Sequence, residues 1–336
     1  MVTVQSYPIA VFCCVITMLC WGSWANTQKL ASRQWPFQLF YWDYAFGVLL
    51  LSLVLAFTMG SSGTAGRSFL ADLAQAQPKW LGYAFVGGVI FNLSNILLVA
   101  AIDIVGLAVA FPVGVGLALI LGVITTYSAT RTGNVPMLSA GVGCILVAII
   151  LDAIAYKRLT TASKDPPTRG ILLSIIAGVL MGGFYSFVAQ SMGSIDPASG
   201  ALEAAKLSPY TAIVLFSCGL FLSNFLWNGI AMARPFRGPA VSYRRYFSDG
   251  NARLHGVGIL GGVIWNIGMA CSIIASSAAG PTLSYGLGQG ATMVGAIWGV
   301  FIWKEFKLAP PGTNRLLGLM FVFYALGLAV LIFSKA

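Results

Sequence analysis

The sequence predicts an all-α polytopic membrane protein, with ten transmembrane helices arranged as a 5+5 inverted-topology repeat. Three observations lead to this fold class. Of the 336 residues, 58% are hydrophobic and only 8% are charged, which is far more apolar than a soluble domain. Apolar runs of about 20 residues, the length that crosses a hydrocarbon core, occur ten times. The stretch Gly87-Gly-Val-Ile-Phe-Asn92 also returns as Gly261-Gly-Val-Ile-Trp-Asn266.

The apolar runs define the expected spans in chain order. They are 8–28, 39–59, 81–101, 106–127, 137–157, 170–192, 209–233, 256–276, 282–302 and 314–333. The first run has neither a basic segment nor a small-residue cleavage site before Trp21, so we expect it to be retained as a span. Very short turns join the third span to the fourth and the eighth to the ninth.

The duplicated stretch divides the chain into two units within one integral membrane domain. The same offset relates later glycines: Gly106 with Gly280, Gly114 with Gly288, and Gly116 with Gly290. We expect residues 1–160 to form the first five-helix repeat and residues 161–336 the second. Because five is odd, the second repeat inserts upside down, as in secondary transporters, whose substrate site lies at the repeat interface near mid-bilayer. Channels and membrane enzymes can be duplicated too.

The net charge of +10 is a topology signal rather than a nucleic-acid site. With ten spans, one face holds all the Lys and Arg residues except Arg67, Lys79, Arg131, Lys206 and Lys335. The positive-inside rule places the richer face in the cytoplasm and both termini outside. We expect the longest loop, 234–255, to lie at an anionic lipid surface.

Several short motifs carry a family resemblance. They are Trp21-Gly-Ser-Trp24, Tyr41-Trp-Asp43-Tyr44, Ala56-Phe-Thr-Met-Gly60, the Gly87-Gly-Val…Asn95…Val105-Gly106 run and Trp298-Gly…Trp303-Lys-Glu305. Together they resemble the plant ureide permeases and the related bacterial glucose/ribose-porter and rhamnose-transporter group of the drug/metabolite transporter superfamily. The resemblance implies a ten-helix, proton-coupled importer of small neutral polar solutes, either ureides and oxo-nucleobases or sugars. The linker between the halves is shorter than in plant members, which favours a bacterial inner-membrane protein.

Two acidic residues within the spans are candidates for ion coupling, because ionisable groups at membrane depth are costly and usually functional. Asp43 lies about one turn into the second span, between Tyr41 and Tyr44, and could bind the coupled proton; the alternative is a structural ion pair with Lys29. Asp152 in the fifth span is the second candidate, although pairing with the nearby basic residues also explains it. His255, at a loop edge, carries no expected role.

Uncharged amide and aromatic side chains within the spans form a candidate solute lining. They are Trp21, Trp24, Asn26, Tyr41, Asn92, Asn95, Tyr185, Gln190, Asn224, Asn266, Tyr285 and Gln289. Such groups suit a flat or ring-shaped, neutral, hydrogen-bonding solute. Interhelical hydrogen bonding is the alternative for each amide, and an interfacial belt is the alternative for the tryptophans. Asn92 and Asn266 hold equivalent positions in the repeat, so we expect them near a common pseudo-two-fold axis.

The sequence offers no catalytic motif. It contains no HExxH, nucleophile elbow or P-loop, and its six cysteines fall inside spans without metal-ligand spacing, so we expect no enzyme activity, cofactor or metal. We expect a secondary transporter in the membrane, a monomer or weak dimer, whose partners are the solute, protons and lipid. Export of drugs or metabolites is one alternative, and it is disfavoured because the first span has no deep acidic residue. A membrane enzyme or scaffold is the other.

Overall fold

The computed structural model describes residues 1–31, 35–105, 107–131, 133–159, 168–196, 199–236, 238–304 and 306–334. From the sequence, we expect Asp103, in the turn between the third and fourth spans, to cap a helix and Glu305 to form a salt bridge. Glu305 and the side chain of Asp103 lie outside this description.

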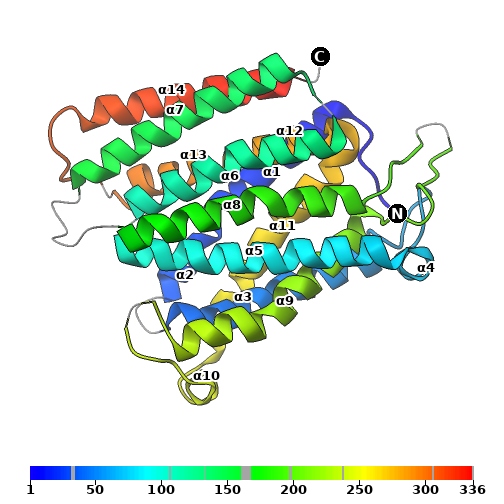
Figure 1. The fold of residues 1–336 in the computed structure, drawn as a ribbon, viewed down its shortest axis with the longest axis horizontal. Coiled ribbons are helices and arrows are strands. Elements are labelled where there is room, and N and C mark those ends of the chain that lie inside the picture. The colour runs from blue at the N-terminus through cyan, green and yellow to red at the C-terminus, as the bar shows by residue number, and fades with distance from the viewer. Residues whose placement is uncertain are drawn as a thin grey trace.

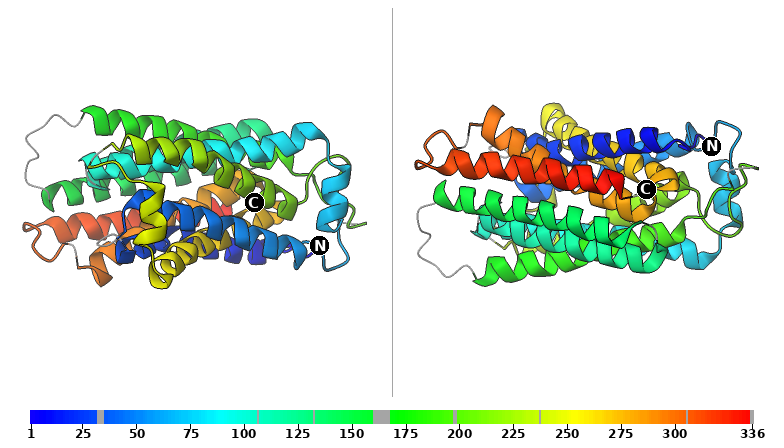
Figure 2. Two further views of the ribbon diagram at one scale, coloured as in Figure 1. Left: turned by 90° about the horizontal axis from the view of Figure 1, so that it is seen from below. Right: turned by 90° about the horizontal axis from the view of Figure 1, so that it is seen from above.

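Long helices running side by side along one axis make up the molecule (Figures 1 and 2). Among the described residues, nine helical segments are long and apolar enough to cross a membrane. They are Tyr7–Ser23 with Ala25–Ala31 (α1 and α2), Phe37–Phe57 (α3), Pro78–Val105 (α5), Leu107–Thr130 (α6), Val135–Leu159 (α7), Thr168–Ser191 (α8), Pro209–Ala233 (α9), Ala252–Ala279 (α11) and Thr313–Phe333 (α14). These agree with nine of the expected spans and confirm the all-α polytopic membrane fold.

The remaining expected span, 282–302, is not one continuous helix. It consists of α12 (Pro281–Gly288), α13 (Ala291–Ile297) and a π-helical turn, η1 (Trp298–Ile302). Two further short helices lie at opposite ends of the molecule: α4 (Phe69–Gln75) near the N-terminus, and α10 (Tyr243–Ser248) in the longest loop (Figure 1).

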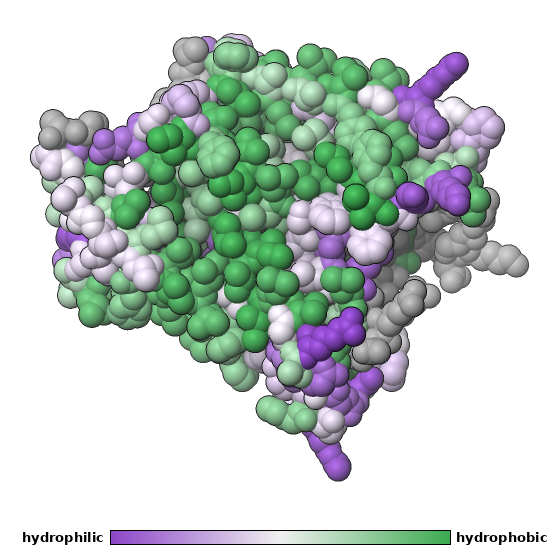
Figure 3. Space-filling view, turned by 180° about the vertical axis from the view of Figure 1, so that it is seen from behind, coloured by the Kyte–Doolittle hydropathy of each residue, from purple (hydrophilic) through white to green (hydrophobic). Residues whose placement is uncertain are grey.

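The outer surface of the helices is apolar, as expected for a protein surrounded by lipid. Large apolar side chains such as Phe12, Leu172 and Phe225 are more than half exposed. Figure 3 shows a broad hydrophobic surface across the length of the helices, with hydrophilic side chains gathered towards the two ends. A continuous apolar surface of this size would be unfavourable in water, and lipid is its natural environment.

Two central helices organise the packing. Helix α5 packs on α8 and α9, and α11 packs on α1 and α3, while α7 and α14 lie together at one edge (Figure 1). Each central helix therefore contacts two helices of the other predicted repeat. This paired arrangement agrees with a duplicated and inverted unit, and the repeat itself stays a prediction.

Candidate functional site

A cavity of about 100 Å³ lies among α1, α5, α6, α8, α11 and the broken segment α12–α13. Its lining contains four of the predicted recognition residues: Trp21, Trp24, Asn95 and Gln289. It also contains residues that were not predicted: Phe91, Leu98, Val115, Met181, Phe184, Trp265, Ala291 and Thr292. No residue of this lining is charged.

The cavity lies where the helix of the ninth expected span is interrupted. Gly280, at a φ of +84° that favours glycine, turns the chain between α11 and α12. Helix α12 then ends at Gly288, and a tight turn at Gln289 and Gly290 precedes α13, with the Gly290 amide donating to the Leu287 carbonyl at 2.9 Å. Gln289 therefore reaches the cavity from a break in a helix. Discontinuous helices form substrate sites in many transporters.

Aromatic rings form most of the cavity wall. The Trp21 and Trp265 rings stack with centroids 5.9 Å apart, and the Trp21 indole donates to the Trp265 carbonyl at 3.2 Å. Phe91 approaches Trp265 with centroids 4.6 Å apart. Phe91 and Trp265 occupy equivalent positions in the duplicated stretch, so this contact joins the two copies at the cavity.

The polar groups of the cavity are oriented by residues behind it. The Asn95 amide nitrogen donates to the Tyr41 hydroxyl at 3.1 Å, and Tyr41 is fully buried against Tyr44. This hydrogen bond uses the amide nitrogen of Asn95, which leaves its carbonyl oxygen to accept. Tyr41 therefore acts behind Asn95 rather than lining the cavity.

A larger pocket of about 510 Å³, which we call the vestibule, lies at the end of the molecule that holds α4 and the N-terminus. Its lining is Trp80, Ala129, Thr130, Ala189, Gln190, Met192, Gly193, Ser194, Ile195, Glu203, Lys206, Pro209, Ser276, Ser277 and Pro281. Of the predicted recognition residues, it contains Gln190.

A thin layer separates the vestibule from the cavity. Tyr185 follows the cavity residue Phe184 on α8 and precedes the vestibule residue Gln190 by about one turn. Its hydroxyl lies 3.2 Å from the Ser272 hydroxyl, and Tyr285 beside it donates to the Ala118 carbonyl at 3.1 Å. Both predicted tyrosines therefore lie between the two spaces.

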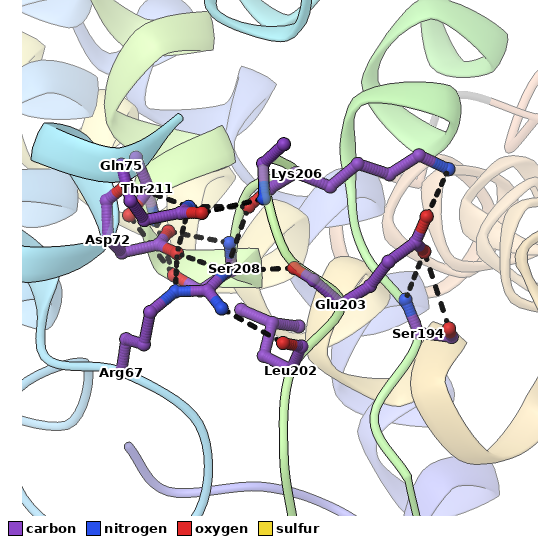
Figure 4. Close-up of polar contacts among 10 residues, drawn as sticks. Arg67, Asp72, Gln75, Ser194, Leu202, Glu203, Lys206, Ser208 and Thr211 are labelled. Carbon is purple, nitrogen blue, oxygen red and sulfur yellow. Dashed lines mark hydrogen bonds and ion pairs between the residues drawn. The ribbon is translucent and has the colours of Figure 1, made fainter. Parts of the chain in front are cut away.

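The vestibule rim is held by a buried ion pair (Figure 4). Asp72 on α4 is fully buried and pairs with Arg67 at 3.0 Å. The Arg67 guanidinium also donates to the carbonyls of Leu202, Glu203 and Lys206 at 2.9–3.0 Å. This clasp ties the loop that precedes α5 to the loop that precedes α9, and thus joins the two predicted repeats.

Four predicted asparagines lie outside the cavity lining. Asn92 is buried and donates to the Ser223 hydroxyl of α9 at 2.9 Å, and Asn266 is buried and donates to the Val48 carbonyl of α3 at 2.8 Å. Neither amide atom of the buried Asn224 has a hydrogen-bond partner among the described residues. Asn26 accepts from the Trp303 indole at 2.7 Å, further towards the α10 end.

Asp43 lies in a cluster at the α10 end of the molecule. Both of its carboxylate oxygens contact His255 Nδ1, at 2.9 and 3.1 Å, and one also accepts a hydrogen bond from the Tyr246 hydroxyl. The Asp43 side chain is 3% exposed, and that of His255 is 28% exposed. Lys29, the alternative partner, instead lies 4.3 Å from the centre of the Trp303 ring.

Helix α10, outside the spans, contributes Tyr246 to this cluster. Burial and the neighbouring Asp43 carboxylate raise the pKa of Tyr246, so its hydroxyl stays protonated and donates throughout the neutral range. Neither His255 nor Tyr246 was predicted as a site residue.

Asp152, the second predicted coupling residue, is found elsewhere. It lies on α7, close enough to Tyr324 of α14 for an electrostatic interaction, and belongs to neither the cavity nor the vestibule.

Known proteins resemble this chain over most or all of its length. The family model described as "Ureide permease" matches residues 40–169 and 157–334. "Ureide permease 1" of Arabidopsis thaliana is 23% identical over 100% of this chain and 99% of its own length. "Probable glucose uptake protein GlcU" of Bacillus cereus is 22% identical over 74% of this chain and 78% of its own.

The fold has a solved counterpart. One crystal structure superposes with a TM-score of 0.63 at 16% identity, covering 97% of both chains, which shows a shared fold. The family match identifies a multi-pass membrane transporter of small solutes rather than an enzyme. With both halves of the sequence matched, this chain belongs to the ureide permease family.

Proposed function

We propose that this protein imports a small, neutral, polar solute by proton symport with alternating access. The observation that carries this proposal is the uncharged cavity, where amides lie beside indole rings at a helix break. A charged solute would lose hydration without gaining a counter-charge there, whereas a neutral solute loses little.

The cavity chemistry favours a flat or ring-shaped solute that has both hydrogen-bond donors and acceptors. The Asn95 carbonyl oxygen accepts from an N–H or O–H, and the Gln289 amide can donate and accept. The aromatic side chains of the lining provide apolar contact surface for a ring-shaped solute. Ureides, oxo-nucleobases and sugars meet these requirements, in keeping with the names of the ureide permease and glucose uptake relatives.

The direction of transport is supported by the asymmetry of the two ends. The vestibule approaches the cavity from the end where both termini are predicted to be outside the cell. On the opposite side, Trp298 donates to Ser23 at 2.9 Å and Trp303 donates to Asn26 at 2.7 Å, so the first span and η1 are tied together. Because that end is tied and the vestibule lies next to the cavity at the other end, we infer that solute enters the cavity from outside. Asp43, on the tied side, is the proposed proton-binding carboxylate.

Uptake into proteoliposomes tests the proposal. Purified protein should accumulate radiolabelled allantoin, uracil or glucose under an inward proton gradient, and a protonophore should abolish the accumulation. A protein that takes up none of these solutes, or takes one up regardless of the protonophore, would contradict proton symport.

A conservative variant ties uptake to the cavity. Tyr41→Phe removes the acceptor that orients Asn95, so the apparent affinity for the solute should fall about 3- to 10-fold, corresponding to one hydrogen bond. Tyr83→Phe is the matched control, because Tyr83 lies at the vestibule end of α5, against Trp80. Equal apparent affinities for the solute in the two variants would show that the orientation of Asn95 does not contribute to solute recognition.

A further inference from the structure

The cluster around Asp43 joins the two predicted repeats at the end opposite the vestibule. Asp43 belongs to α3 in the first repeat, whereas Tyr246 on α10 and His255 on α11 belong to the second. Helix α11 approaches α3 closely here, because a Cβ added at Gly258 would lie 2.4 Å from the Asp43 Cβ. The three side chains therefore connect helices that must separate if this end opens.

Few other groups reach the Asp43 carboxylate. Trp35, just before α3, packs edge-on against His255 with centroids 5.4 Å apart. The basic residues of the surrounding elements are engaged elsewhere or face outward: Arg245 on α10 pairs with Asp249 at 2.9 Å, and Arg253 on α11 is exposed. Tyr246 and His255 are thus the titratable side chains that face Asp43 in the described structure.

The hydrogen bonds depend on the protonation state of Asp43. An ionised carboxylate accepts from both Tyr246 and His255, and hydrogen bonds to a charged group are worth about 1.5–3 kcal/mol each. When Asp43 binds a proton, it loses its charge and one acceptor oxygen becomes a donor. The ties from α3 to α10 and α11 weaken together.

His255 provides a path for that proton. Its Nδ1 contacts Asp43, while Nε2 lies towards Gly250 in the short turn between α10 and α11, and its side chain is 28% exposed. A proton from water binds at Nε2 while the Nδ1 proton passes to an Asp43 oxygen. The imidazole ends neutral in its other tautomer, and the carboxylate becomes a carboxylic acid.

We propose that His255 is a second coupling residue, which carries the proton between water and Asp43, and that Asp43, His255 and Tyr246 form a latch released by that proton. The proposal rests on the proposed proton symport. It assigns a function to the one histidine of the chain and to the short helix α10.

Hydrogen exchange of the α10 segment tests the latch without any solute. In the wild-type protein, exchange over residues 234–252, corrected for the intrinsic rate, should rise about tenfold or more between about pH 8 and pH 5, as the charged hydrogen bonds are lost. Asp43→Asn, which mimics the protonated state, should exchange fast at both pH values, and Arg253→Gln, at an exposed position outside this segment, should behave as wild type. Unchanged wild-type protection across this pH range overturns the latch, whether or not Asp43→Asn folds.

Transport separates the role of His255 from a structural one. His255→Asn keeps a donor near the position of Nδ1 but cannot carry a proton. It should retain α10 protection at about pH 8 and counterflow exchange of the solute found by uptake, and lose proton-driven accumulation about tenfold or more. Wild-type accumulation by this variant would overturn the role of His255. If the wild-type protein transports none of the tested solutes, the proposed function fails, while hydrogen exchange still decides the latch.

Discussion

The close approach of helices in the two halves can be tested with four glycines. A Cβ added at Gly88 on α5 would lie 1.9 Å from the Phe216 carbonyl oxygen of α9, and one at Gly262 on α11 would lie 2.0 Å from the Tyr44 carbonyl oxygen of α3. Gly82 and Gly256 have no atom within 4 Å of an added Cβ. Gly82 and Gly256 are related by the same offset as Gly88 and Gly262, so each buried glycine has an exposed control on its own helix.

The expected magnitudes follow from these contacts. The clash at Gly88 or Gly262 is with backbone, which cannot rotate away, so alanine should cost the upper part of the overpacking range, about 3 kcal/mol. Alanine is also a better helix former than glycine by about 1 kcal/mol, leaving a net loss of about 2 kcal/mol. At Gly82 and Gly256 only the propensity gain of about 1 kcal/mol applies. The two classes should therefore differ by about 3 kcal/mol.

Thermal unfolding of the purified variants measures this difference. For a chain of this length, about 2 °C per kcal/mol places Gly88→Ala and Gly262→Ala about 6 °C below their controls. The two buried variants should be equally destabilised, because the predicted repeat makes their contacts equivalent. The equivalence of the α5–α9 and α11–α3 contacts would be refuted if Gly88→Ala were as stable as Gly82→Ala while Gly262→Ala was destabilised.

Three further predictions concern the site and the topology. Gln289→Leu should lower the apparent solute affinity about 3- to 10-fold in uptake assays while leaving the melting temperature unchanged, because the Gln289 side chain lines the cavity at the helix break. A reporter fused at Met1 should be active only outside the cytoplasm, and cytoplasmic activity would reverse the predicted orientation. Because the pKa of Tyr246 is raised, its contribution to stability should fall only above about pH 10, so the melting-temperature difference between wild type and Tyr246→Phe should shrink as the pH rises beyond that value.

The spans could be predicted from the sequence because hydrophobic length is a direct requirement of the bilayer. The break in the ninth span could not be located in this way. Hydropathy averaged over a window of residues does not detect where the backbone hydrogen bonds of a helix are interrupted. The local signals were nevertheless present: Gly280 precedes Pro281, and Gly288 and Gly290 flank Gln289. Glycine on both sides of an amide marks the point where the helix stops.

The cavity lining was only partly predictable. These helices are apolar on every side, so the periodicity of their hydrophobic residues does not show which face points towards the cavity. The duplicated stretch pointed to Asn92 and Asn266, yet Phe91 and Trp265 line the cavity. Adjacent helical residues differ by about 100° in direction, so only one of each pair can face it. The amides instead bond neighbouring helices, which was their alternative interpretation.

The partners of Asp43 were beyond local sequence reasoning for a different reason. His255 is 212 residues away from Asp43 along the chain, and Tyr246 belongs to a short helix within a basic loop. Neither hydropathy nor charge distinguishes a loop that remains at the lipid surface from one that folds back over a buried carboxylate. Only the contact between α3 and α11 brings the two ionisable groups together.

The separation of Asp43 from the cavity bears on how a proton could drive transport. The described cavity lining holds no ionisable carboxylate or histidine, and Asp43 lies beyond Tyr41 and Tyr44 towards α10. A proton at Asp43 therefore cannot be shared directly with a solute at Asn95 or Gln289. In the proposed symport, coupling would act through the helices, with protonation of Asp43 favouring opening at α10. A neutral solute suits this arrangement, because the coupled proton and the solute would bind at different sites of the protein.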